Sequence, residues 1–340
     1  MKTIFAVDDN DTNLTMAKKA LENSYRVFTM PSAAKLFALL EKITPDLILL
    51  DIEMPDMNGF EALSYLKTCS LYANIPVIFL TSHTDDAVEV RGFVLGAVDF
   101  ITKPFSTPVL LNRIKTHLNI DELIRERTAQ IKRLQNGIVT VLADVVEERD
   151  KRTGGHNDRT ARYVKILINA MEKRELYIGE ISGWDKEMVA SSARLHDVGK
   201  VHVLDTILNK PGKLSAEEYE RMKLHTTEGA QIIDRMIEQT GEEGFLHNAK
   251  LFAEYHHECW DGTGYPHGLT GTDIPLQGRI MALADVYDAL VSQRPYKEAY
   301  THKEAVQIIT TMSGKHFDPK IVEVFLEVKD RLNEVREASL

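Results

Sequence analysis

Two short segments in the second half of the chain combine histidines and carboxylates at spacings that suit metal binding. Residues 256–266 read HHECWDGTGYP, and residues 194–200 read RLHDVGK. A neighbouring pair such as His196-Asp197 can place an imidazole on one metal ion while its carboxylate bridges to a second. Imidazole and carboxylate ligands without cysteine suit iron, manganese or zinc. These two segments therefore predict a metal centre.

Further candidate ligands lie between and beyond these segments. The full set of predicted metal ligands is His196, Asp197, His225, His256, His257 and Asp285. Six ligands are enough for two metal ions that keep open positions for water. Lys200 follows His196 by four residues, so a helix would place it on the same face, where it could point at a bound phosphate. Asp288 lies one helical turn after Asp285. The predicted chemistry is therefore attack on a phosphate ester.

This combination resembles the HD-GYP family, a branch of the HD phosphohydrolases, over residues 146–326. The resemblance rests on His196-Asp197, on the Gly264-Tyr265-Pro266 signature and on ILNKPGKL at residues 207–214. It implies an all-helical domain with a centre of two or three metals, usually iron or manganese. Members hydrolyse cyclic dinucleotides, typically cyclic di-GMP, to a linear dinucleotide and sometimes on to mononucleotides.

The resemblance also implies roles for individual residues. It assigns substrate binding to Lys200, Asp288, Arg294 and Lys297. We also expect Tyr265 to contact the substrate by shaping its pocket, and we predict Asp197 and Lys200 as the catalytic residues. Contacts between the exposed Gly-Tyr-Pro turn and diguanylate cyclase proteins are a further expectation.

One position departs from the family pattern. Members with three metals carry a glutamate four residues before the histidine that corresponds to His156, and this chain has Arg152 there. An arginine removes a ligand and adds positive charge beside any third ion, so we expect two metals per chain, iron or manganese. His156 is then expected to lie outside the ligand set, as a supporting or substrate-facing residue. Cys259 fills a variable position and is expected to be a spectator thiol.

The first 120 residues predict a separate α/β domain. Apolar runs of strand length at residues 4–7, 47–50 and 77–80 end in polar side chains, and amphipathic stretches lie between them. This alternation predicts a doubly wound, parallel, five-stranded sheet with helices on both faces. In such folds the site forms at the carboxyl ends of the strands. The polar residues expected there are Asp8, Asp9, Asp51, Thr81 and Lys103.

Clustered carboxylates at this edge predict a Mg²⁺ site, because Mg²⁺ prefers hard oxygen ligands. The metal would let Asp51 attack a phosphoryl group and form an acyl phosphate. The pattern resembles a response-regulator receiver domain over residues 1–120. The resemblance implies that Asp51 accepts phosphate from a sensor histidine kinase and that Asp8, Asp9 and Asp51 hold Mg²⁺. It further implies that Thr81, Phe100 and Lys103 form the switch.

Residues 121–145 predict a helical connection between this domain and the metal-binding domain at 146–340. Apolar residues recur mainly at intervals of three and four, at Ile124, Ile131, Leu134, Ile138, Val141 and Val145. No proline interrupts residues 109–145, so a continuous helix should join the two domains. Its apolar seam predicts a parallel coiled coil and a homodimer. The alternative is that this face packs on its own domain.

The overall composition narrows the function further. A length of 340 residues predicts two domains, and 44% hydrophobic residues can fill two cores. A net charge of −10 argues against binding to DNA, which needs a positive field. Cys69 and Cys259 give no disulfide framework, which fits a reducing compartment. No secretory segment or membrane-spanning run is visible, so we expect a cytoplasmic protein without membrane insertion. The receiver resemblance implies a bacterial one.

These patterns together predict a phosphorylation-controlled, metal-dependent cyclic dinucleotide phosphodiesterase. Cyclic GMP-AMP is an alternative substrate, because residues that read the bases cannot be identified in the sequence. A rival from another class is a catalytically slow cyclic dinucleotide-binding module that signals through protein contacts. A second rival is a di-iron oxygenase.

Overall fold

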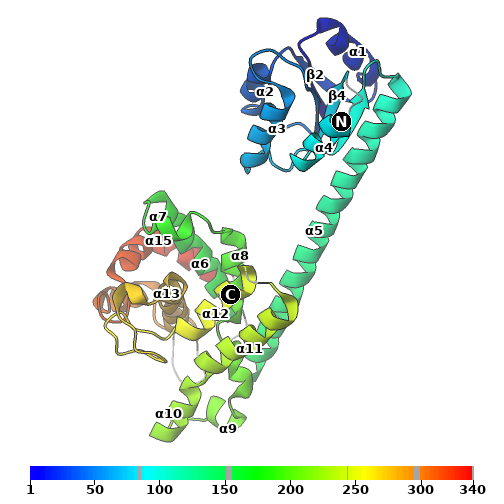
Figure 1. Ribbon diagram of the computed structural model, residues 1–340. Helices are drawn as coiled ribbons and strands as arrows, with labels where there is room; N and C mark the ends of the chain where they lie inside the picture. Colours follow the sequence, from blue (N-terminus) through cyan, green and yellow to red (C-terminus); the bar gives the residue numbers. More distant parts are fainter. Residues whose placement is uncertain (83–85, 151–154, 243, 294–298, 339–340) are drawn as a thin grey trace. The chain divides into compact units, whose positions relative to one another are not determined.

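A computed structural model describes residues 1–82, 86–150, 155–242, 244–293 and 299–338 (Figure 1). The chain divides into two compact units, residues 1–131 and 132–340. The boundary falls inside a single long helix, α5 (Thr107–Arg149). Among the described residues, no helix combines the length and the apolar character needed to span a bilayer.

The first unit is built on a five-stranded parallel sheet with the strand order β2-β1-β3-β4-β5. The strands are β1 (Thr3–Val7), β2 (Arg26–Met30), β3 (Leu47–Asp51), β4 (Val77–Thr81) and β5 (Asp99–Thr102). Strands β3 and β4 are buried at every residue, which explains why they are apolar without alternation. The predicted doubly wound sheet is therefore confirmed.

Helices cover both faces of this sheet. They are α1 (Asp11–Leu21), α2 (Ala33–Leu40), α3 (Gly59–Thr68), α4 (Asp86–Val94) and the first part of α5. Leu14 of α1 and Ile114 of α5 pack on one face, while Leu36 of α2 and Leu63 of α3 pack on the other. This arrangement leaves the carboxyl ends of β1, β3 and β4 at one edge, where their acidic and hydroxyl side chains follow.

The second unit is helical in its described residues. Its α-helices are α6 (His156–Lys173), α7 (Ile178–Ile181), α8 (Lys186–Ser192), α9 (Asp205–Leu208), α10 (Ala216–Lys223), α11 (His225–Thr240), α12 (Gly244–Tyr255), α13 (Leu276–Val291), α14 (His302–Thr311) and α15 (Pro319–Glu337). Its short 3₁₀ helices are η1 (Ala193–Leu195), η2 (Val198–His202) and η3 (Gly271–Asp273). The core lies mainly between α6, α13 and α15, around Tyr163, Tyr287 and Phe325.

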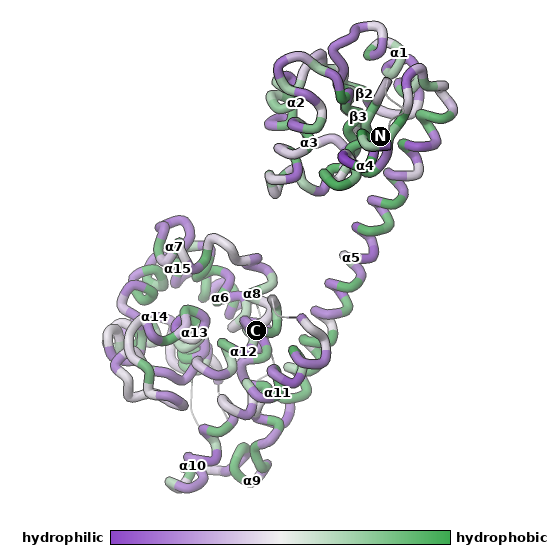
Figure 2. The backbone as a smooth tube through the Cα atoms, viewed as in Figure 1, coloured by the Kyte–Doolittle hydropathy of each residue, from purple (hydrophilic) through white to green (hydrophobic). Residues whose placement is uncertain are grey.

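Helix α5 is packed at both ends and exposed in between. Its N-terminal part buries Leu110, Ile114 and Leu118 in the core of the first unit. Near its C-terminus, Val139 joins a cluster of the second unit. The apolar residues between these ends are exposed in the chain, and hydrophobic and hydrophilic residues alternate along this stretch (Figure 2). The predicted continuous helix is confirmed, and the predicted boundaries at residues 120 and 145 both fall within it.

Candidate metal centre and phosphoacceptor site

The His196-Asp197 pair lies between two short 3₁₀ helices rather than within one α-helix. Helix η1 ends at Leu195 and η2 begins at Val198. This geometry brings Lys200 to Asp197, with 2.7 Å between Nζ and Oδ2, instead of aligning it with His196. Gly199 allows η2 to approach α11, because a Cβ at this position would lie 1.9 Å from the carbonyl oxygen of His225.

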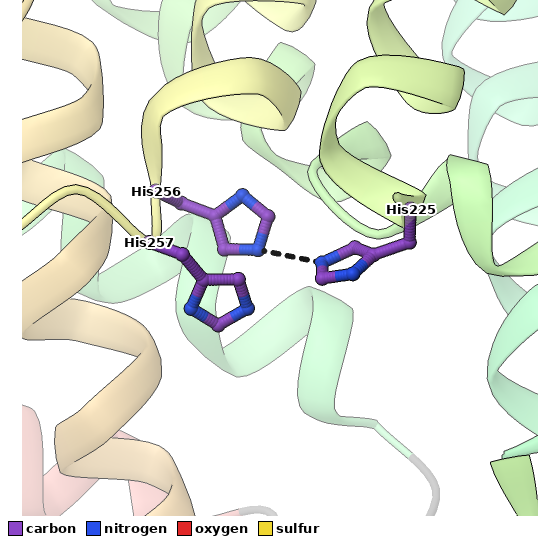
Figure 3. Close-up of side chains that lie close together, drawn as sticks. All are labelled: His225, His256 and His257. Carbon is purple, nitrogen blue, oxygen red and sulfur yellow. Dashed lines mark hydrogen bonds between the residues drawn. The ribbon is translucent and has the colours of Figure 1, made fainter. Parts of the chain in front are cut away.

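A first cluster of three imidazoles forms where α11 begins and α12 ends. His225 is the first residue of α11, and His256 and His257 directly follow α12. One nitrogen from each ring lies within 4.8 Å of the other two, and all three rings face a common space (Figure 3). The Nε2 atoms of His225 and His256 are 3.3 Å apart. This cluster can hold one metal ion.

A second cluster contains His156, His196 and Asp285, whose donor atoms also lie within 4.8 Å of one another. The Nε2 atom of His156 is 3.4 Å from Nε2 of His196 and 3.3 Å from Oδ1 of Asp285. His156 is the first residue of α6, and Asp285 lies on α13. The structure thus places His156 among the candidate ligands, whereas the sequence indicated a position outside them.

The carboxylate of Asp197 lies between the two clusters. Its Oδ2 atom is 3.4 Å from Nε2 of His196 in the second cluster. Its Oδ1 atom is 3.5 Å from Nε2 of His225 and 3.8 Å from Nε2 of His256 in the first cluster. One oxygen therefore faces each cluster, which is the geometry expected of a bridging carboxylate.

The histidines present their Nε2 atoms to the centre because main-chain carbonyls bind the other ring nitrogen. The Nδ1 atoms of His196, His225 and His256 lie 2.7 to 3.0 Å from backbone oxygens of residues three or four positions earlier. A carbonyl accepts only, so Nδ1 carries the proton and the Nε2 lone pair faces inward. This is the arrangement by which proteins orient metal-binding imidazoles.

Burial keeps most of these imidazoles neutral. It lowers the pKa of His256 to about 3, with help from the neighbouring His196 and His225 rings. Burial likewise lowers the pKa of His257 and His225. Burial alone would lower the pKa of His196 too, but the carboxylate of Asp197 raises it. Neutral imidazoles beside the carboxylates of Asp197 and Asp285 fit divalent cations, so the donor set suits two such ions.

Asp288, expected to contact substrate, is buried and faces the protein. Its carboxylate accepts from Nε and Nη2 of Arg159 at 2.7 and 2.9 Å, and its Oδ2 lies 2.8 Å from Nδ1 of His156. Burial opposes ionisation, but the hydrogen bonds from His156 and Arg159 hold the pKa of Asp288 well below its usual range. Arg159 lies one helical turn after His156, a spacing visible in the sequence but not used above.

Lys200 is also buried, with its ammonium group between two carboxylates. It donates to Asp197 and to Asp150 at 2.7 Å each. The charge of Lys200 thus lies directly beside the carboxylate that joins the clusters.

The Gly-Tyr-Pro turn packs on the first cluster. The ring of Tyr265 lies 4.8 Å from that of His257 at an interplanar angle of 32°. Gly264 allows the turn to fold tightly, because a Cβ there would lie 2.2 Å from the backbone nitrogen of Cys259. The Cys259 thiol itself lies 3.3 Å from Nδ1 of His316.

The carboxylate of Glu258 binds the segment that directly follows this turn. Its side chain is 2% exposed and accepts from the backbone N–H groups of His267, Gly268 and Leu269 at 2.7 to 3.1 Å. In the sequence, Glu258 is visible only as part of the segment HHECWDGTGYP, and the pattern assigned it no role of its own. Three predicted residues, Arg152, Arg294 and Lys297, lie outside the described residues.

The first unit brings its predicted acidic residues together. Donor oxygens of Asp8, Asp9 and Asp51 lie within 4.8 Å of one another. Lys103 bridges two of them, with Nζ 2.8 Å from Asp8 and 2.7 Å from Asp51. Burial raises the pKa of Asp51, and it would lower that of Lys103, but hydrogen bonds to Asp51 and Asp8 raise it. The cluster fits a hard divalent cation beside a carboxylate nucleophile.

The predicted switch residues lie on β4, on β5 and directly after β5. Thr81 ends β4 and is buried, and its carbonyl accepts from the backbone N–H of Lys103. Phe100 on β5 points into the unit, where its ring lies 5.4 Å from Phe79 and 5.0 Å from Phe93.

Comparison with known families covers both units. Residues 4–115 match the response regulator receiver domain, and residues 140–321, more than half of the chain, match the HD domain. The chain belongs to the HD domain family. It is a response regulator in which a receiver domain with the acidic cluster precedes an HD domain with both histidine clusters.

Two relatives align with nearly the whole chain, across both units. It is 40% identical to a probable cyclic di-GMP phosphodiesterase of Vibrio cholerae, over 95% of this chain and 77% of that protein. It is 31% identical to the cyclic di-GMP phosphodiesterase response regulator RpfG of Xanthomonas campestris, over 98% of this chain and 89% of that protein. A 3′3′-cGAMP-specific phosphodiesterase of Vibrio cholerae is 40% identical over 58% of this chain and 36% of that protein.

Proposed function

We propose that this response regulator hydrolyses a cyclic dinucleotide, with cyclic di-GMP as the first candidate, to the linear dinucleotide. The observation that carries the proposal is the pair of histidine clusters in the HD domain with one oxygen of Asp197 facing each. The names of relatives that align across both units support the same substrate class.

We further propose two divalent metals per chain, iron or manganese. His156, His196 and Asp285 would hold one, and His225, His256 and His257 the other. When bound, such ions lower the pKa of water and offset charge on a phosphodiester. Lys200 fixes the orientation of Asp197, so its effect on the reaction passes first through that carboxylate.

The substrate would bind over the same clusters. The ring of Tyr265 packs against the ring of His257, so a substrate bound at the first cluster would contact Tyr265. We propose that Arg294 and Lys297 bind the phosphates of the substrate. Asp288 is proposed to act through His156, because Arg159 and His156 occupy its oxygens.

Phosphorylation of Asp51 is proposed to control this activity. The Asp8-Asp9-Asp51 cluster would bind Mg²⁺, with a sensor histidine kinase as phosphodonor. Thr81, Phe100 and Lys103 would respond to the phosphoryl group. Helix α5 is the continuous element between the two domains, and its exposed apolar residues support pairing with a second copy.

Cyclic GMP-AMP is a second candidate substrate, favoured by the similarity of the HD domain to a 3′3′-cGAMP-specific enzyme. A panel of cyclic dinucleotides separates the two candidates. Protein purified without oxygen and loaded with Fe²⁺ or Mn²⁺ should convert one of these cyclic dinucleotides to its linear form. Chromatography of samples taken over time measures the conversion. Metal-loaded protein that binds but cleaves none of them would indicate the slow binding module instead. Activity that requires O₂ would indicate an oxygenase.

A further inference from the structure

The last turns of α5 contact two segments that carry residues of the candidate metal centre. Glu147 is 8% exposed, although it is a glutamate on the helix that arrives from the receiver domain. Its Oε1 accepts from the backbone N–H of His156 at 2.9 Å, and its Oε2 accepts from that of Asn157 at 3.3 Å. These are the first two residues of α6, so Glu147 binds the helix end that carries a candidate metal ligand.

This contact replaces a cap that α6 lacks. The residue before the helix is Gly155, which has no side chain to accept from the first N–H groups. Unsatisfied N–H groups at a helix start are normally bound by a side chain of the preceding residue, and a negative charge there is also favoured by the helix dipole. Glu147, which lies on a different helix, supplies both the acceptor oxygens and the negative charge. The side chain of Asn157 returns the contact by donating to the carbonyl of Ala143 on α5 at 3.1 Å.

The same end of α5 also holds the segment that carries Lys200. The guanidinium group of Arg149 donates to the carbonyls of Val201 and Val203 at 2.7 and 3.2 Å, and to Asp205 at 2.8 Å. Asp150, the next residue, accepts from Lys200. The last two turns of α5 and the residue that follows them therefore contact a candidate ligand of the second cluster on one side and the partner of Asp197 on the other.

We propose that Glu147 is a positioning residue that sets the place of His156 in the metal centre. Because Glu147 lies on α5, we propose further that the receiver domain acts on the metal centre through this carboxylate. The regulatory part rests on the proposed function, whereas the positioning part requires only that the clusters bind metal. A cap with a merely structural role would change the stability of α6 but leave the ligand geometry of the folded protein unchanged.

The test uses full-length protein loaded with Co²⁺, whose visible absorption reports the number and geometry of its ligands. Glu147→Gln keeps the shape of the side chain but replaces one acceptor oxygen with a donor that faces an N–H group. Supporting contacts of this kind typically change metal affinity by about ten-fold or more. We therefore expect about ten-fold weaker binding of one Co²⁺ and an altered spectrum in Glu147→Gln, and a larger effect in Glu147→Ala. Glu148→Gln is the matched control, because Glu148 is exposed on the next position of the helix.

Circular dichroism identifies which variants are folded, and only these are compared. If Glu147→Ala does not fold, Glu147→Gln alone tests the positioning role. A wild-type Co²⁺ spectrum and affinity in folded Glu147→Gln would overturn the positioning role. For the regulatory part, beryllofluoride should shift the Co²⁺ spectrum of the wild type but not that of Asp51→Ala or Glu147→Gln. An equal shift in Glu147→Gln, or none in the wild type, would overturn it. A wild type that binds two Co²⁺ and cleaves no cyclic dinucleotide when loaded with Fe²⁺ or Mn²⁺ would instead refute the proposed function and leave the positioning role standing.

Discussion

The Nδ1 atom of His156 lies 2.8 Å from a carboxylate oxygen of Asp288, although 132 residues separate them in the chain. Arg159 binds the same carboxylate from the other side, so Asp288 stays ionised and its position is fixed. The ring of His156 is thereby turned so that Nε2 faces His196 and Asp285. When an imidazole binds a metal, an ionised and buried carboxylate on its other ring nitrogen orients the ring and makes it a stronger metal ligand.

Asp288→Asn should therefore weaken metal binding without removing a ligand. The amide keeps the size of the side chain but loses the charge that holds His156 and Arg159. We expect turnover, or the affinity for one of the two metal ions per chain, to fall by about 10- to 100-fold. Metal analysis by mass spectrometry and turnover of cyclic di-GMP measure this. Asp330→Asn is the control, because the Asp330 side chain is 79% exposed; an equal loss there would contradict the explanation.

Lys200→Met should keep both metals and reduce catalysis. The substitution removes the positive charge beside Asp197 while its thioether chain fills the buried space. Loss of one buried electrostatic contact at a reacting centre typically costs about 10²-fold in kcat. Metal content and kcat should be measured together. Lys250→Met, at a partly exposed lysine paired with Asp234, serves as the control. A Lys200→Met protein without metal would show that the lysine supports binding instead.

Glu258→Gln should disturb the segment that directly follows the Gly-Tyr-Pro turn. The carboxylate accepts three backbone N–H groups in a buried site, and an amide places a donor against at least one of them. An unsatisfied buried group of this kind costs about 1–3 kcal/mol of unfolding free energy. Urea titration followed by tryptophan fluorescence reports on this domain, because Trp184 and Trp260 both lie in it. The exposed Glu238→Gln should leave the midpoint unchanged.

Beryllofluoride at Asp51 should change the turnover of the wild type by at least about two-fold, through coupling between the two domains. Asp51→Ala should abolish the response, because the acceptor carboxylate is missing. Replacing Ile131 and Ile138 with Asp should also abolish it while leaving the metal content unchanged, because both residues are exposed on α5 and lie on the proposed seam. Sedimentation velocity tests whether the same changes alter dimerisation. Equal turnover with and without the mimic would exclude this form of control.

The pair of Asp288 and Arg159 predicts a dependence of stability on pH. The pKa of Asp288 is lower in the folded protein than the value of about 3.9 expected in the unfolded chain. Its stabilising contribution is therefore complete above that value and is lost as pH falls through the folded pKa. The difference in melting temperature between metal-free wild type and Asp288→Asn should therefore shrink as the pH falls from about 4 to about 2.5. A constant difference over that range would contradict the prediction.

Much of this arrangement was predictable from residue types and spacing. The apolar runs that end in Asp8, Asp51 and Thr81 gave the sheet and its acidic edge, because strand length and carboxyl-end polarity are local features. The proline-free stretch before residue 145 likewise predicted the continuous helix that is observed. The motif residues His196, His225 and His256 come together in one centre, since each stands at the end or start of a helix that packs on its neighbours.

Contacts that depend on long-range packing could not be predicted in the same way. The place of His156 depends on Glu147 binding the start of α6, and that of Asp288 depends on Arg159. Each partner is an ordinary charged residue in the sequence, and only burial gives it a specific role. Lys200 was expected to follow His196 along an α-helix, but the local 3₁₀ geometry turns it towards Asp197 instead.

The unbroken course of α5 has a consequence for linker length. Each inserted residue turns everything that follows by about 100°, whereas seven residues add nearly two full turns. One inserted residue between Leu118 and Val139 would turn Glu147 about the helix axis by about 100°. Insertions of seven residues should preserve signalling and insertions of two or five should disrupt it. Natural chains that join the same two domains are therefore expected to differ in linker length by near-integral numbers of helical turns.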